Sequence, residues 1–166
     1  MKKLSLLAAL LAATAISACS PKFDWRDFRS NDAPYAVLFP GKPATHTRSV
    51  NLDGLDVKMT MAAAEIDGTL FAVGSAEVAD ASQAPQAAAA MKTAMVRNIG
   101  ATIIKESANG NVKEIEAKGM RNGTPMLLSG RFLFKDKRVY QVVVLGSEKH
   151  FEKEAVETFM SSFKLN

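Results

Sequence analysis

Residues 55–78, LDVKMTMAAAEIDGTLFAVGSAEV, decide the fold class of this 166-residue chain. In the first half, apolar residues at every second position alternate with polar ones such as Asp56 and Lys58, the period of a half-buried β-strand. Asp67-Gly68 then provides a hairpin turn before a second strand over residues 69–78. The stretch therefore predicts antiparallel strands that are neighbours both in the sequence and in the sheet.

The same pattern extends in both directions from this hairpin. The strands before it are expected to join it in a four-stranded meander, in which Asp53-Gly54 is another hairpin turn. Asn122-Gly123 gives a further clear hairpin turn among the strands that follow. The last strand is apolar at every position except Gln141, which is typical of a strand covered on both faces. We therefore expect a layer on each side of the sheet. The additional strands are predicted at residues 35–39, 45–50, 101–107, 112–121, 126–134 and 139–145.

Two segments have helical spacing instead. Residues 80–98 are rich in alanine, with Asp80 or Ser82 available as the N-cap and Gly100 just beyond the end. Residues 148–163 predict a second helix capped by Ser147. Its apolar stripe faces a core, with residues at spacings of four: Phe151, Ala155, Phe159 and Phe163.

Three motifs resemble the PsbP-like family, which includes many bacterial lipoproteins. They are Phe39-Pro40-Gly41-Lys42-Pro43 after the first strand, Val139-Tyr140-Gln141-Val142 in the last strand, and Ser161-Ser162-Phe163-Lys164-Leu165 after the closing helix. The resemblance covers residues 33–166 and implies an α+β fold, an alpha/beta/alpha sandwich in which an antiparallel sheet is flanked by helices. It also implies an accessory, assembly or docking role, although fold alone does not determine function.

The N-terminal segment has the layout of a secretory signal peptide. Lys2 and Lys3 are followed by an uncharged apolar run over residues 4–16 and by the small residues Ser17 and Ala18. The run is shorter than the roughly 20 residues that a membrane-spanning helix requires. No later stretch of the sequence is longer, so no transmembrane helix is expected.

Ile16-Ser17-Ala18-Cys19 resembles the lipobox of bacterial lipoproteins. The resemblance implies cleavage before Cys19, a diacylglyceryl group on its thiol and an acylated new amino terminus, an anchor that holds a protein stably on a bilayer. Ser20 replaces the Asp that retains such proteins in the inner membrane, which favours the outer membrane. The alternative is a secreted protein cut after Ala18. We expect a signal peptide (1–18), a lipidated arm (19–32) and one domain (33–166).

Composition excludes several classes of protein. With 48% hydrophobic and 23% charged residues the chain is typical of globular proteins, and its single cysteine excludes an intramolecular disulfide framework. The formal charge is +4 for the whole chain. It falls to +2 once Lys2 and Lys3 are removed, because 19 basic residues then face 17 acidic ones. This balance gives no case for a nucleic-acid partner.

The arm after Cys19 carries three aromatic residues among charges: Phe23, Trp25 and Phe28. One interpretation is an edge strand that packs these rings onto the domain. The other is an exposed aromatic patch that contacts lipid headgroups or a partner, since Trp favours interfaces.

No residue pattern indicates a catalytic or metal site. His46 and His150 show no metal-ligand spacing, and no nucleophile elbow or phosphate-binding loop is present. We therefore expect a non-enzymatic protein without cofactor or metal. Four arginines could form a basic face toward an acidic partner or lipid, although scattered arginines usually belong to a solvated surface: Arg48, Arg121, Arg131 and Arg138. Loops at residues 40–43, 51–54 and 122–125 are candidate binding positions.

The hypothesis from the sequence is an outer-membrane lipoprotein on the periplasmic side. It would contact the bilayer through Cys19 and bind an envelope protein as an assembly or accessory subunit. A carrier of a small ligand or metal ion is the alternative, and an enzyme of unknown type is the third.

Overall fold

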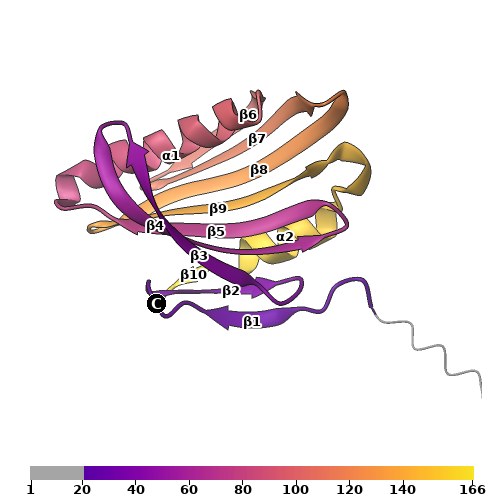
Figure 1. Cartoon of the computed structure of the whole chain (residues 1–166), viewed down its shortest axis with the longest axis horizontal. Helices are drawn as coiled ribbons and strands as arrows, with labels where there is room; N and C mark the ends of the chain where they lie inside the picture. Colours follow the sequence, from indigo (N-terminus) through magenta and orange to yellow (C-terminus); the bar gives the residue numbers. More distant parts are fainter. Residues whose placement is uncertain (1–20) are drawn as a thin grey trace, which may run out of the picture.

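The computed structural model describes residues 21–166, which form ten strands and two α-helices in a predominantly antiparallel β fold. Strands make up 55% of these residues and helices 21%. Seven strands form the large sheet in the order β3-β4-β5-β9-β8-β7-β6 (Figure 1). Their bounds are β3 (Ala44–Leu52), β4 (Leu55–Ile66), β5 (Thr69–Glu77), β6 (Thr102–Asn109), β7 (Val112–Arg121), β8 (Thr124–Lys135) and β9 (Arg138–Ser147).

The hairpins predicted at Asp53-Gly54, Asp67-Gly68 and Asn122-Gly123 are confirmed. In each turn both residues have positive φ, for example 49° at Asp67 and 77° at Gly68. Asn, Asp and Gly tolerate this backbone region better than other residues, and two successive positive φ angles match the twist of the paired strands. These turns therefore determine the register of β3–β4, β4–β5 and β7–β8.

The first predicted strand belongs to a separate, three-stranded sheet. β2 (Tyr35–Phe39) pairs with β1 (Arg26–Arg29) on one side and with the short β10 (Lys164–Leu165) on the other. The predicted four-stranded meander is therefore wrong at its first member, and only β3, β4 and β5 form it. The buried side of β2 packs on aromatic residues of the second helix instead, with the Phe39 and Phe159 rings 5.3 Å apart.

The first predicted helix is confirmed. A 3₁₀ turn over Ala81–Gln83 leads into α1 (Ala84–Asn98). Asp80 caps the 3₁₀ turn with a capping box, in which its carboxylate accepts from the Ser82 amide and its own amide donates to the Gln83 side chain. The buried face of α1 is made of Ala84, Ala87, Ala88 and Met91.

The second helix starts five residues later than predicted. α2 covers Lys153–Ser162, and residues 148–150 form a separate 3₁₀ turn. The Ser147 side chain does not cap a helix, because its Oγ lies 3.4 Å from Nδ1 of His150. The carbonyl of His150 accepts from both the Thr69 hydroxyl and the Glu152 amide, so both of its lone pairs are used and it cannot also accept the bond of a first α-helical turn. The predicted Ser147 cap is therefore wrong.

The expected alpha/beta/alpha sandwich of the PsbP-like type is also wrong. A ten-residue helix is about 15 Å long, too short to form a helical layer over a seven-stranded sheet. α2 shares its face of the sheet with β1, β2 and β10, and the result is a β-rich fold with two sheets rather than a sheet flanked by helices (Figure 1).

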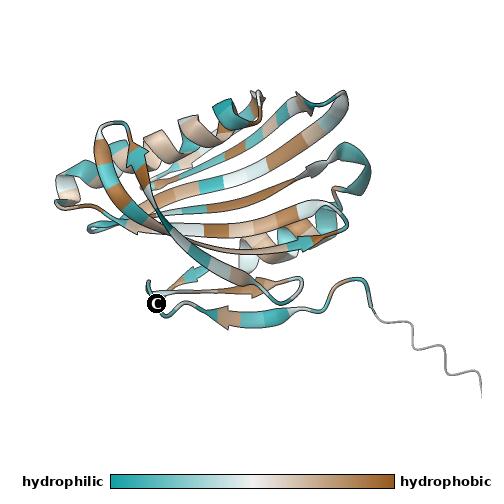
Figure 2. Ribbon diagram, in the orientation of Figure 1, coloured by the Kyte–Doolittle hydropathy of each residue, from teal (hydrophilic) through white to brown (hydrophobic). Residues whose placement is uncertain are grey.

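The prediction that the last long strand is covered on both faces is confirmed. Val139 and Val143 of β9 belong to the core under α1, whereas Val142 and Val144 belong to the core under α2 and the small sheet. Figure 2 shows hydrophobic residues running through β9 in the middle of the sheet, while both helices carry hydrophilic segments. Two cores thus lie back to back on one sheet.

Candidate functional site

An open groove of about 910 Å³ runs between α2 and the neighbouring part of the large sheet. Its floor is the side of β6, β7 and β8 that faces α2, and its wall is the outward side of α2 together with Phe151. The small sheet lies over the other part of this face, so α2 separates the closed part from the open part. The groove is the main candidate for a functional site.

Strand β7 shows why this surface is polar. Its Ile115 and Ala117 are buried beneath α1, whereas Glu114, Glu116 and Lys118 alternate with them and line the groove. The period of two places the charged side chains on the α2 face of the sheet, in the part that α2 leaves open. The polar character of the groove floor is therefore set by the sequence of β7.

Each basic residue of the groove lining is matched by a carboxylate. Arg131 lies 2.7 Å from Glu114, and the pairs Lys105–Glu116 and Lys118–Glu148 measure 3.3 and 3.4 Å. On α2, Lys153 and Glu157 are 3.9 Å apart. The lining holds four basic residues (Lys105, Lys118, Arg131, Lys153) and four acidic ones (Glu114, Glu116, Glu154, Glu157), so its net charge is zero.

Arg131 also ties the sheet to α2. Its guanidinium donates to the backbone carbonyl of Met160, at 2.9 Å, as well as to Glu114. The carbonyls of a helix's last turn have no partner within the helix, so this bond satisfies one of them. Arg131 therefore sets the width of the groove near the end of α2.

Apolar side chains lie between these charges. They are Ile104, Leu127, Phe151, Val156 and Met160. Ile104 is 55% exposed because the β6–β7 register shifts between Ile103 and Lys105, and such a bulge turns a side chain out of the regular alternation. A smaller hollow of about 280 Å³ shares Ser107, Glu114 and Arg131 with the groove and extends it to Phe163 and Leu165.

The groove ends at a free sheet edge. β6 is the terminal strand of the large sheet and pairs only with β7. Seven of its eight residues are exposed. Its outward backbone N–H and C=O groups are therefore open to a strand from another polypeptide.

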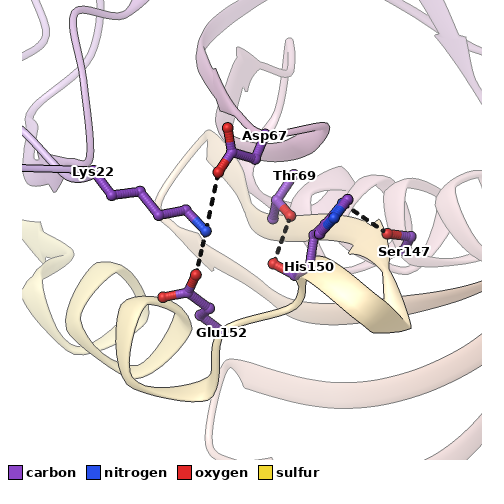
Figure 3. A network of polar contacts seen from close by, with 6 residues as sticks. All are labelled: Lys22, Asp67, Thr69, Ser147, His150 and Glu152. Atoms are coloured by element: carbon purple, nitrogen blue, oxygen red, sulfur yellow. Dashed lines mark hydrogen bonds and ion pairs between the residues drawn. The ribbon is translucent and has the colours of Figure 1, made fainter.

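A second polar cluster joins the N-terminal arm to the domain (Figure 3). Lys22 Nζ forms ion pairs with Asp67 of the β4–β5 turn, at 3.1 Å, and with Glu152 before α2. The Lys22 ammonium donates hydrogen bonds to Glu152 and Asp67, and these bonds raise the pKa of Lys22 above its ordinary value. Beside them, Thr69 donates to the His150 carbonyl. The cluster holds the arm against the domain.

The aromatic residues of the arm pack on the domain. Phe23, Trp25 and Phe28 are half-buried against the core that contains α2 and β2. Phe28 meets Phe39 edge to face, with ring centroids 5.4 Å apart, and the rings of Phe23 and Trp25 lie 5.8 Å from each other. Cys19, the predicted lipidation site, lies outside the described residues.

The other predicted positions are spread over the surface. His46 on β3 pairs with Met61 of β4, and His150 contacts Thr69, which follows Ile66 across the next turn. Met61 and Ile66 are five residues apart, a rise of about 17 Å along a strand. The structure therefore does not bring His46 and His150 together.

Arg138, another of the predicted surface positions, pairs with Glu77 at 2.8 Å. Within residues 21–166, no three His, Cys, Asp or Glu side chains form a metal-binding group.

The sequence prediction missed the groove. Its signal was present in β7, where charged residues occupy every second position over residues 114–118. A strand inside a sandwich that is closed on both sides would not carry three charges on one face. Of the four arginines considered as a possible basic face, Arg131 alone lines the groove, where it is paired with Glu114.

Comparisons with known proteins assign no family to this chain. No family model matches the chain, and no curated protein matches it. Among solved structures, the protein of unknown function PA94 from Pseudomonas aeruginosa is similar over 75% of this chain and 84% of its own length, with 12% identity and a TM-score of 0.34. In the described part of the chain, no helix is long and apolar enough to cross a membrane.

Proposed function

We propose that this protein is a lipid-anchored, non-catalytic binding or assembly subunit on the periplasmic side of the bacterial outer membrane. Its groove binds an extended polypeptide segment of an envelope partner. The observation that carries the proposal is that the groove ends at the free edge of β6. A polypeptide is the class of partner that can pair with that edge and place side chains in the groove at the same time.

The chemistry of the lining supports a polypeptide partner. Equal numbers of acidic and basic residues favour a segment that carries charges of both signs. Apolar contact points such as Ile104 and Leu127 lie between those charges. Because successive side chains of a bound strand point to opposite faces, every second residue would enter the groove.

The anchor rests on the sequence. A basic start, an apolar run of 13 residues and Ile16-Ser17-Ala18-Cys19 together support export and lipidation, and Ser20 supports the outer membrane. Two or more acyl chains hold a protein stably on a bilayer. A binding protein anchored in this way would meet partners at the membrane surface.

A carrier of a small ligand is the second candidate. The groove volume of about 910 Å³ lies within the range of small-molecule sites, roughly 300–1,000 Å³. The open wall at β6 favours the polypeptide, because small-molecule sites bury most of the surface of their ligand.

Metabolic labelling with a fatty acid tests the anchor. The wild-type protein is expected to take up the label and to fractionate with the outer membrane, and Cys19→Ser is expected to remain unlabelled. An unlabelled wild type, or equal label in both proteins, contradicts the anchor.

Site-specific photo-crosslinking in cells tests the groove. A photoreactive residue at Ile104 is compared with one at Met120, which is 61% exposed and does not line the groove. We expect a discrete protein adduct from position 104 only, which Leu127→Lys abolishes. Equal adducts from both positions contradict the groove. A stoichiometric small molecule in native mass spectrometry of the full mature protein, without a protein adduct, would support the carrier.

A further inference from the structure

We infer that the end of the domain around Lys22, the β4–β5 turn and the start of α2 faces the bilayer and is held within about 10 Å of it. This inference rests on the proposed lipidation of Cys19. It identifies the surface of the domain that meets the lipid, which the anchor alone does not.

The first support is the attachment of Lys22. Its ammonium group is held between Asp67 Oδ2, at 3.1 Å, and Glu152. These carboxylates come from two different elements, the β4–β5 turn and the segment before α2 (Figure 3). The Nζ atom also lies 5.4 Å from the centroid of the Phe23 ring, a cation–π contact. The arm is therefore attached to the domain from its second described residue onward.

The residues that follow Lys22 are also fixed to the domain. The Asp24 amide donates to the Pro40 carbonyl at 3.0 Å. Phe23 and Trp25 pack against the aromatic core, and from Arg26 onward the chain is paired in β1. Separating the arm from the domain would expose both rings and break this pairing. The attachment point of the tether is therefore Lys22.

The tether arithmetic follows from the sequence. Cys19 and Lys22 are three residues apart, and three residues span at most about 10 Å when fully extended. A Gly/Ser-type linker of 18 residues would have a root-mean-square span of about 23 Å. With so short a tether, only the surface close to Lys22 can contact the membrane.

This arrangement also places the groove. Phe151 and Lys153 line one end of it and flank Glu152, which holds Lys22. The other end continues toward Phe163 and Leu165. The groove therefore begins beside the bilayer and extends away from that attachment point. A partner that enters it would be a protein at or near the same membrane.

The Lys22 cluster itself does not attract anionic lipid by charge. The single ammonium of Lys22 is shared by two carboxylates, so the cluster carries a net charge of −1. A basic patch would add about 1 kcal/mol per exposed Lys or Arg on anionic lipid. The domain is therefore expected to contact the membrane only when its anchor is present.

Energy transfer from Trp25 tests the inference. Trp25 is the only tryptophan of the chain and lies three residues after Lys22. The purified lipidated protein is placed in phosphatidylcholine/phosphatidylglycerol vesicles that contain a dansyl-labelled headgroup lipid. We expect strong transfer from the wild type, and a decrease of at least about twofold when 15 Gly/Ser residues are inserted between Ser20 and Pro21. The same insertion between Asn109 and Gly110, a distant turn, should leave the transfer unchanged.

Cys19→Ser protein should show no transfer, even on vesicles rich in anionic lipid. The inference is overturned if lipidated wild type and the tether insertion give equal transfer, or if the Cys19→Ser protein binds the vesicles. Mass spectrometry of the same wild-type sample measures the acylation of Cys19 separately. Absence of the acyl mass contradicts the proposed function, whereas an acylated protein with weak transfer contradicts only the orientation.

Discussion

The two faces of the large sheet differ in how completely they are covered. The 15-residue α1 lies along one face and buries small residues and Met91 against β8 and β9. On the other face, the ten-residue α2 and the small sheet cover β5 and β9, and the surface of β6–β8 beside α2 remains an open groove. One face is a core, and the other is divided into a core and a binding surface.

The difference shows that stability and binding are assigned to opposite sides of the same strands. The edge of the sheet gains its stability through Ile115, 2% exposed, and Ala117 on the α1 face. The groove side of β7 is therefore free to carry charged residues. Changes on the groove side should alter binding more than folding, and the reverse should hold for the two cores.

The largest effect is expected from the aromatic core under α2. Phe159 is fully buried and lies between Phe39 and Phe71, with ring centroids at 5.3 and 5.4 Å. Phe159→Ala should lower the free energy of unfolding by about 3–5 kcal/mol, measured by urea unfolding followed through Trp25 fluorescence. Met91→Ala is the matched change under α1. Its loss should be smaller, near the lower end of about 2–5 kcal/mol, and a larger loss at Met91 would reverse the comparison.

The next largest effect is a loss of stability at alkaline pH, which arises from Tyr35 in the core under α2. Burial raises the pKa of Tyr35 to about 12. Below about pH 10, the pKa of Tyr35 in the unfolded chain, the Tyr35 hydroxyl is neutral in both the folded and the unfolded state. Between about pH 10 and pH 12 it ionises only in the unfolded state. The free energy of unfolding should therefore fall by about 1.4 kcal/mol per pH unit in that window.

Tyr35→Phe should make this fall less steep. Urea unfolding at pH 9, 10 and 11 measures it, since these values cover the start of the window. Burial also raises the pKa of Tyr140, so part of the slope should remain and Tyr140→Phe serves as the companion variant. Identical slopes in wild type and Tyr35→Phe would show that Tyr35 is ionised in the native state as readily as in the unfolded one.

The smallest effect distinguishes the groove from the cores. Arg131→Met replaces the apolar stem of the side chain but removes the bonds to Glu114 and to the Met160 carbonyl, for an expected loss of about 1–2 kcal/mol. Lys105→Met removes only an exposed ion pair with Glu116 and should cost about 0–1 kcal/mol. Thermal unfolding of both variants measures the difference. An equal loss would mean that Arg131 does not hold α2 to the sheet.

Local patterns predicted most of the elements. Asp-Gly and Asn-Gly pairs located three hairpins because few other residues adopt two successive positive φ angles. The alternation in residues 55–63 located β4, and the Ala-rich segment with Asp80 located α1. Each prediction depends on interactions between residues close together in the sequence. The start of α2 was wrong because the Thr69–His150 bond that ends the preceding turn joins residues 81 apart.

The sequence by itself determined the strands, their turns, the first helix and the alternation of charge that makes one side of β7 polar, because these depend on local backbone preferences and on a period of two. Only the tertiary structure decided which sheet β2 joins, how short α2 is and that a groove remains beside it. Those outcomes depend on which elements compete to cover the same apolar face of the large sheet. The alternation of Tyr35, Val37 and Phe39 fits a strand of either sheet equally well, so it does not decide between them. The position of Lys22 between Asp67 and Glu152, which are far apart in the sequence, is also decided only by the tertiary structure. It determines which end of the domain lies nearest Cys19.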